Sequence, residues 1–187
     1  MIILAIVLLV LGAWVVFTFN GLVQLRNQVA NAFRQIDVQL KRRHDLIPNL
    51  VESVKGEMKF EKETLERVIQ ARGAAVSAGQ GGNMNEILAK EGMLTQALGR
   101  LMAVSENYPN LKANEAVRTL MEELTHTENQ IGFARQLYND VVTKFNTQQQ
   151  VFPTNLFAAM LGFSPSVLWE LPADSPDRET PKVNLAV

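Results

Sequence analysis

The chain has 187 residues, with 18 Lys and Arg against 19 Asp and Glu, and it contains no cysteine. Acidic and basic residues are interspersed and nearly balance, which excludes the basic surface of a nucleic-acid-binding protein. The lack of cysteine excludes a disulfide framework. Scarce aromatic residues and the lack of alternating β-branched runs predict an all-α protein.

The N-terminal segment is apolar and uncharged. The first charged side chain is Arg26, and residues 2–19 are almost continuously apolar. These eighteen residues would span roughly 27 Å as a helix, close to a hydrocarbon core about 30 Å thick. Residues 1–25 are therefore predicted to be a retained transmembrane anchor. A cleaved signal peptide and a buried core helix are the alternatives, but the segment has no basic n-region and no small-x-small cleavage site.

The charges that follow the anchor predict its orientation. Residues 26–43 carry five basic side chains against Asp37 alone, and no Lys or Arg precedes them. The positive-inside rule then predicts a single-pass membrane protein with its domain in the cytoplasm and its N-terminus outside.

Apolar residues with three-four spacing continue the anchor directly into a helical domain. The first stripe runs from Leu22 to Ile36, and Pro48 is expected to kink or briefly break this helix. Residues 77–83 contain three glycines and predict a loop. Asn83 is expected to cap the next helix, with Glu86 completing a capping box.

The last long helix is predicted from about Asn114 to Gln150, which gives an elongated antiparallel bundle of about four helices. Residues 154–163 predict a short helix capped by Thr154, which either closes the bundle or lies on a membrane surface. The resulting division is an anchor at 1–25, a helical bundle at 26–163 and a flexible tail at 164–187.

Enzyme signatures are scarce. No cysteine nucleophile, Gly-x-Ser-x-Gly turn or Walker loop is present. Glu123 and His126 have the Glu-x-x-His spacing of bundle di-iron sites, but the required second pair is missing. We therefore predict no catalytic residue, no metal and no cofactor.

Two charges fall on the core stripe of the last helix. Glu128 and Arg135 lie seven residues apart among apolar positions, where a charge is costly unless it is paired. We expect a structural network, whose predicted partners on the first helix are Asn27, Arg34, Asp37 and Asp45. A groove that binds a ligand or partner, and simple contact with solvent, are the alternatives. The basic run at 41–43 is interpreted as a solvated face.

Several segments resemble the LemA family in order and spacing. The main one is QLKRRHDLIPNLVESVKG at 39–56; the others are RNQV at 26–29, IDV at 36–38, LERVIQAR at 65–72, SENYPNLKA at 105–113, ENQI at 128–131, ARQLYN at 134–139, FPTN at 152–155 and LGF at 161–163. One mild departure is Phe33, where the family commonly has Trp. The resemblance implies one membrane helix followed by a mainly cytoplasmic bundle, with no established enzymatic activity. It also implies a fold or assembly role for the motif residues Arg43, Asp45, Pro48, Asn49, Glu128, Arg135 and Tyr138.

A relative among magnetosome-membrane proteins implies a role in organising or shaping membranes. Together with the apolar anchor, the resemblance predicts a non-enzymatic, self-associating scaffold of the bacterial inner membrane, whose partners are membrane lipids and further copies of itself, not nucleic acid. The alternative is a tethered sensor or adaptor that holds another membrane protein.

Overall fold

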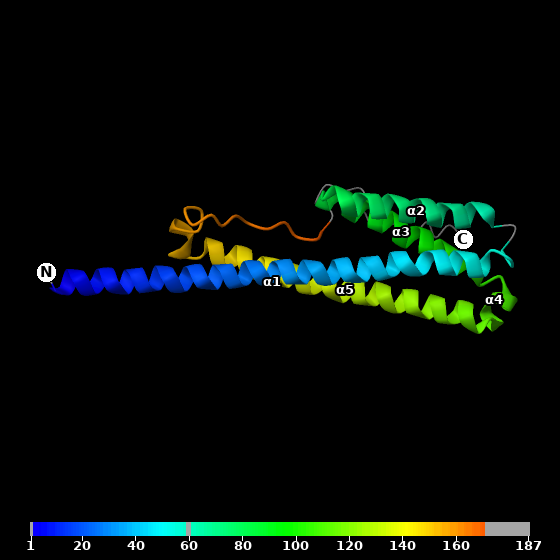
Figure 1. The fold of residues 1–187 in the computed structure, drawn as a ribbon, viewed down its shortest axis with the longest axis horizontal. Helices are drawn as coiled ribbons and strands as arrows, with labels where there is room; N and C mark the ends of the chain where they lie inside the picture. Colours follow the sequence, from blue (N-terminus) through cyan, green and yellow to red (C-terminus); the bar gives the residue numbers. More distant parts are fainter. Residues whose placement is uncertain (1, 59–60, 171–187) are drawn as a thin grey trace, which may run out of the picture. The chain divides into compact units, whose positions relative to one another are not determined.

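The computed structural model describes residues 2–58 and 61–170, and all regular structure within them is helical (Figure 1). This confirms the predicted all-α helical bundle that follows an N-terminal apolar helix. The elements are α1 (Ile2–Val54), α2 (Lys62–Gly81), α3 (Met84–Ser105), α4 (Pro109–Ala113), α5 (Glu115–Gln150) and a 3-10 turn, η1 (Thr154–Leu156).

The chain forms two compact units. Among the described residues, the first unit, called here the anchor unit, comprises 2–39 and 130–168; the second, called the four-helix unit, comprises 40–58, 61–129 and 169–170. This division differs from the predicted boundaries after residues 25 and 163. Residues 2–25 belong to the same unit as the helical segments that follow them.

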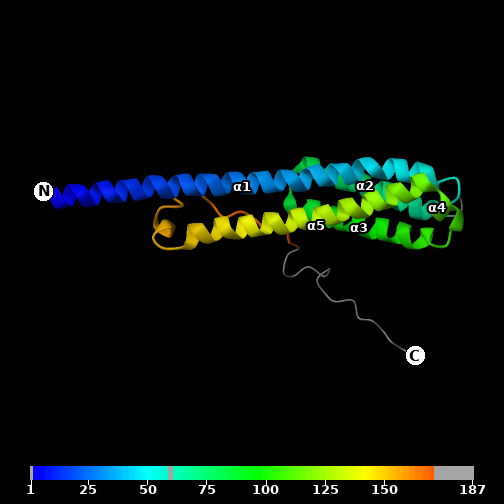
Figure 2. The same ribbon diagram turned by 90° about the horizontal axis from the view of Figure 1, so that it is seen from below.

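In the anchor unit, α1 and α5 lie side by side and run in opposite directions (Figure 2). Most of the predicted stripe of α1 is buried, including Leu22 and Ile36, as are Ile131 and Phe145 of α5. The rings of Phe33 and Tyr138 meet edge to face at 5.9 Å. No linker separates the apolar N-terminal residues from this packed part of α1, because the helix is continuous.

The chain after α5 folds back onto the anchor unit. The expected helix at 154–163 is instead the turn η1 followed by further turns, and Pro153, not Thr154, occupies the N-cap position. The N–H groups of Leu156 and Phe157 bond to carbonyls three residues earlier, which winds the chain more tightly than an α-helix. The Phe152–Pro153 peptide is cis. We call residues 151–163 the cap segment.

Residues 164–170 are also held in place, although they were expected to belong to a mobile tail. The Ser166 N–H donates to Asn146 Oδ1 at 2.8 Å, and Asn146 Nδ2 donates to the Ser166 carbonyl at 2.9 Å. The hydroxyl of Tyr138 donates to the Val167 carbonyl at 2.9 Å. The rest of the predicted tail, 171–187, lies outside the described residues.

In the four-helix unit, parts of α1 and α5 pack with α2 and α3 around an aliphatic core that includes Leu50, Val68, Leu94 and Leu124. The expected loop at 77–83 is much shorter, because α2 continues to Gly81. Gly82 then adopts the left-handed conformation (φ 71°), which glycine accepts without steric cost. The Asn83 side chain accepts hydrogen bonds from the N–H groups of Asn85 and Glu86, as predicted for a helix cap.

Pro48 does not break α1, which continues to Val54. A proline inside a helix leaves the carbonyl four residues earlier without its usual N–H donor. That carbonyl belongs to His44, and it accepts a 2.6 Å hydrogen bond from Nε of Arg72 on α2. A neighbouring helix thus supplies the missing donor, and α1 continues through Pro48 without the short break that was one of the two expectations there.

Candidate functional site: a buried charge cluster

Arg43 lies at the centre of the most polar buried site in the described residues of the four-helix unit. It follows Leu40 and precedes Ile47 with three-four spacing, so its side chain points into the core with these two residues, and it is 0% exposed. The interpretation of 41–43 as a solvated basic face is therefore wrong for Arg43.

Two carboxylates form ion pairs with the Arg43 guanidinium. It donates hydrogen bonds to Glu91 on α3 and Glu128 on α5, and its Nη1 also donates to Thr95 Oγ1 at 3.0 Å. The Glu91 side chain is fully buried, whereas that of Glu128 is 37% exposed. A planar guanidinium with several N–H groups suits such a site, because it binds both carboxylates at once.

The cluster extends to the four long helices that pack in this unit. Nε2 of His44 lies 2.9 Å from Oε1 of Glu91, and the hydroxyl of Thr95 donates to Glu128 Oε1 at 3.3 Å. The Arg72 bond to the His44 carbonyl adds α2. The cluster therefore joins α1, α2, α3 and α5 through five charged or titratable side chains: Arg43, His44, Arg72, Glu91 and Glu128.

The environment of Glu91 favours its charged form. Burial alone would raise the pKa of this carboxyl, but the hydrogen bond with His44 and the positive charge of Arg43 outweigh it and bring the pKa below 4.5. Glu91 is consequently a carboxylate at neutral pH, and its charge is compensated inside the core.

The cluster is suited to holding helices together. The carboxylates already accept hydrogen bonds from Arg43, and within residues 2–58 and 61–170 no group of three or more His, Asp or Glu side chains could hold a metal ion. Glu123, one half of the Glu-x-x-His pair, lies 3.4 Å from the exposed guanidinium of Arg42. Fixing the α1, α3 and α5 register is the role that this geometry supports.

The structure distributes the predicted site residues between the two units. The partner of Glu128 on α1 is Arg43. The expected partners, Asn27, Arg34, Asp37 and Asp45, were therefore the wrong residues of this helix. The predicted residues that lie exposed on α1 are Arg34, Asp37, Asp45, Pro48 and Asn49. In the anchor unit, Arg135 is half-buried and Tyr138 is buried. Burial raises the pKa of the Tyr138 hydroxyl.

Sequence reasoning missed Glu91, Thr95 and Arg72. Glu91 could have been found by the argument that identified Glu128, because it lies between Ile87 and Leu94 on the apolar stripe of α3. The contribution of Arg72 depends on a contact between α2 and the backbone of α1, and no pattern within one helix indicates it.

Among the described residues, α1 is the one helix long and apolar enough to cross a membrane, judged by length and composition. Its most apolar 18-residue window has a mean hydropathy of 2.9, and none of that window is buried inside the protein. Together, the helical bundle and this unburied apolar helix define the class of a membrane-associated all-α protein.

The chain belongs to the LemA family, whose model matches residues 32–185. It is similar to the magnetosome protein MamQ 2 of Paramagnetospirillum magneticum, with 24% identity across 90% of this chain and 70% of that protein. It is also 28% identical to the protein LemA of Metamycoplasma hominis, across 76% of this chain and 64% of the relative. The MamQ of Magnetospirillum gryphiswaldense is 24% identical, across 78% and 62%.

Proposed function

We propose that this chain is a non-enzymatic scaffold of the bacterial inner membrane that self-associates and thereby organises or shapes the bilayer. In this proposal α1 crosses the membrane once, the N-terminus lies outside and the bundle lies in the cytoplasm. The similarity to proteins named as magnetosome components supports a role at an organised membrane. The observation that carries self-association is an exposed apolar face on the anchor unit.

This face is formed by residues 34–39 of α1 and 130–137 of α5. Val38, Phe133 and Leu137 are exposed there, and Phe133 has two thirds of its surface open. They line a groove of about 460 Å³ together with Arg34, Gln35, Gln39, Gln130 and Ala134. An apolar patch with a polar rim is typical of a protein interface, and glutamine amides can both donate and accept across a symmetric contact.

Anchoring in a membrane favours a second copy of this chain as the partner that covers this face. Every inserted copy has the same orientation and is confined to one plane, which raises its effective concentration for its neighbours. Because α1 is continuous from Ile2 through Val38, the anchor also fixes the height of the face above the bilayer. Two copies can therefore bring the same residues together by lateral diffusion and rotation.

The experiment combines native mass spectrometry with crosslinking in membranes. The chain has no cysteine, so Val38→Cys and Phe133→Cys each introduce a single thiol. We expect oligomers of the full chain in mild detergent, and crosslinked dimers with a bifunctional maleimide at both positions. Ala30→Cys, also exposed on α1, is the matched control and should crosslink far less.

Three results would reject or redirect parts of this proposal. Only monomers in native spectra, with no crosslink at either position, would exclude self-association. A different membrane protein that copurifies at fixed stoichiometry and crosslinks to Phe133→Cys would support the adaptor instead. Labelling of Ala30→Cys by an impermeant maleimide in intact cells would overturn the cytoplasmic orientation.

A further inference from the structure

A second long uncharged stretch lies near the C-terminal end of the described chain. No charged side chain occurs from Phe145 to Trp169, between Lys144 and Glu170. This stretch includes the last turns of α5 and the whole cap segment. In the same unit, α1 is uncharged up to Arg26.

The two uncharged stretches begin at the same level of the anchor unit. Tyr138 of α5 faces Phe33 of α1, and the helices are antiparallel. Counting six residues forward along α5 and six back along α1 from this pair brings Lys144 opposite Asn27, next to Arg26. The charged residues of both helices therefore stop at one plane, and α5 and the cap segment continue past it beside the anchor.

Aromatic contacts give the depth that the cap segment reaches. The rings of Phe19 and Phe163 lie 5.6 Å apart, and the Arg26 guanidinium lies 5.4 Å from the Phe163 ring centre. Phe157 contacts Trp14 at 6.1 Å. Trp14 precedes Arg26 by twelve residues, about 18 Å along a helix, whereas the headgroup layer is only about 5–8 Å thick. In a membrane crossed by α1, Phe157 would thus lie below the headgroups.

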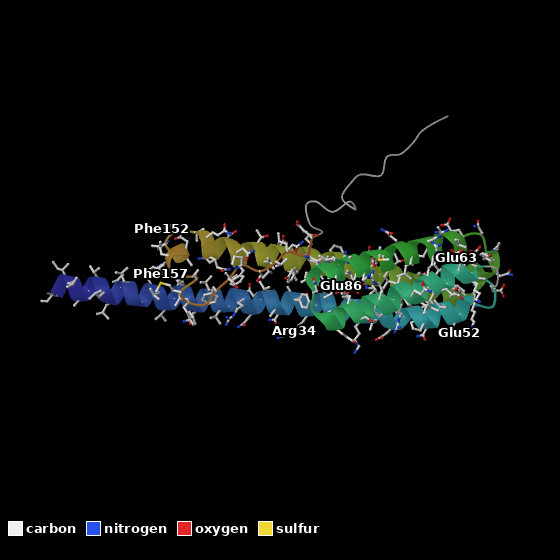
Figure 3. The ribbon with its side chains drawn as sticks, turned by 90° about the horizontal axis from the view of Figure 1, so that it is seen from above. Arg34, Glu52, Glu63, Glu86, Phe152 and Phe157 are labelled. Carbon is white, nitrogen blue, oxygen red and sulfur yellow. The ribbon has the colours of Figure 1, made fainter. Side chains whose placement is uncertain are left out.

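At this depth the cap segment presents apolar side chains outward. Phe163 and Ala158 are buried on its inner side, whereas Phe152 is 79% and Met160 is 83% exposed, and Leu156 is exposed beside them. Figure 3 shows Phe157 against α1 and Phe152 on the outer side of the turn. Many of the cap's backbone N–H groups bond within the segment, including those of Asn155, Ala158 and Leu161, which lowers the cost of entering hydrocarbon.

We propose that the cap segment is a second membrane-inserted element, and that Phe152, Leu156 and Met160 contact the acyl chains of the leaflet on the domain's side. The occupant of this surface is lipid, because the surface is continuous with the exposed apolar surface of the anchor. The inference rests on the proposed single membrane crossing by α1. The inserted cap segment would add protein volume to one leaflet only. This asymmetry is a physical means by which the protein could bend the bilayer locally.

Depth-dependent fluorescence quenching on the full chain in lipid vesicles tests this placement. Met160→Cys and Phe152→Cys are labelled separately with an environment-sensitive fluorophore. Leu9→Cys in the anchor reports membrane crossing, and exposed Gln136→Cys reports the aqueous side of the charged plane. We expect phospholipids spin-labelled on the acyl chain to quench positions 160, 152 and 9 at least twofold more than position 136, with iodide giving the opposite order.

The outcomes separate the cap from the anchor. Lipid quenching at position 9 together with iodide quenching at 160 and 152 would overturn the inserted cap and leave the anchor intact. If position 9 also remained accessible to iodide, the membrane crossing would itself fail. Shielding of 160 and 152 from both quenchers, with crosslinking between copies, would assign the surface to a protein contact and contradict the proposal.

Discussion

Helices α1 and α5 contribute to both units, and the two units stabilise them by different means. In the four-helix unit they are joined by α2 and α3, and a buried arginine with its carboxylates lies among aliphatic side chains. In the anchor unit they are joined by aromatic contacts and by the returning chain at 151–168, which pairs through neutral hydrogen bonds. Buried paired charges distinguish the four-helix unit, whereas aromatic, aliphatic and neutral polar contacts are prominent in the anchor unit.

This contrast shows how one pair of helices can serve two environments. Charged side chains can be retained inside the four-helix unit because each buried charge has a partner there. The anchor unit has no charged side chain on α1 before Arg26, on α5 after Lys144 or on the cap segment, as suits contact with lipid. The following predictions test each side of this comparison.

The largest effect is expected from Arg43→Met. It leaves the Glu91 carboxylate buried without its main cationic partner, which costs about 3–5 kcal/mol of unfolding free energy. Urea denaturation of the full chain in detergent, followed by circular dichroism, measures this loss. In a double-mutant cycle with Glu91→Gln, the two losses should be strongly non-additive. Additive losses, or a loss below about 1 kcal/mol, would contradict the proposed dependence on paired charge.

Arg72→Met is expected to have the next effect. It removes the donor that replaces the missing N–H of Pro48, so the His44 carbonyl loses its hydrogen bond at a cost of about 1–3 kcal/mol. The control is Pro48→Ala, which restores an N–H to α1. In that background Arg72→Met should cost measurably less in the same denaturation assay. Equal costs in both backgrounds would show that Arg72 stabilises the unit in some other way.

Acid should weaken the four-helix unit through Glu91. The folded pKa of this carboxyl is depressed, so between its ordinary pKa near 4.5 and the lower folded value the unfolded chain binds a proton that the folded chain does not. Its stabilisation is present above about pH 4.5 and is lost as the pH falls through the folded pKa. The variant Arg43→Met/Glu91→Gln should show a shallower decline in unfolding free energy below pH 5 than the unaltered chain. If the two declines were parallel, Glu91 would be excluded as the source of the acid sensitivity.

Much of the fold followed from single-helix patterns, because apolar spacing and capping residues act locally. The stripe from Leu22 to Ile36, the Asn83 cap and the end of α5 at Gln150 were all predicted this way. The short break that was one alternative at Pro48, and the mobile tail expected at 164–170, do not occur, and the reason is different. In both, the deciding hydrogen bond comes from a distant segment: Arg72 for the first, and Asn146 and Tyr138 for the second.

The site was only partly predictable for the same reason. A charge on an apolar stripe can be recognised within one helix, and this rule identified Glu128 and Arg135. The choice of partner depends on the relative register of two helices, which the sequence of neither helix contains. Arg43 follows Lys41 and Arg42, and this basic run was assigned to the surface as a whole. The spacing of Arg43 with Leu40 and Ile47 nevertheless places its side chain inside.

A smaller effect is expected in the anchor unit from Tyr138→Phe. Loss of the hydroxyl bond to the Val167 carbonyl should cost about 1 kcal/mol, because this bond is neutral and the ring itself remains packed. Hydrogen exchange should quicken at residues 166–168 and remain unchanged in α3. Asn146→Ala, which removes both bonds to Ser166, should quicken the same amides further. Unchanged exchange in both variants would show that the aromatic packing alone holds this segment.

The smallest effect is expected from Arg42→Gln, at the position next to Arg43. Arg42 lies 3.4 Å from Glu123, but both side chains are nearly half exposed, so water screens the pair and its loss should cost less than about 0.5 kcal/mol. Raising the salt concentration should remove even this difference, whereas the cost of Arg43→Met should persist, because buried pairs are screened much less. Two adjacent arginines, each near an acidic partner, would then differ several-fold in energy through burial alone. If Arg42→Gln cost as much as Arg43→Met, burial would not be what distinguishes the cluster from the surface.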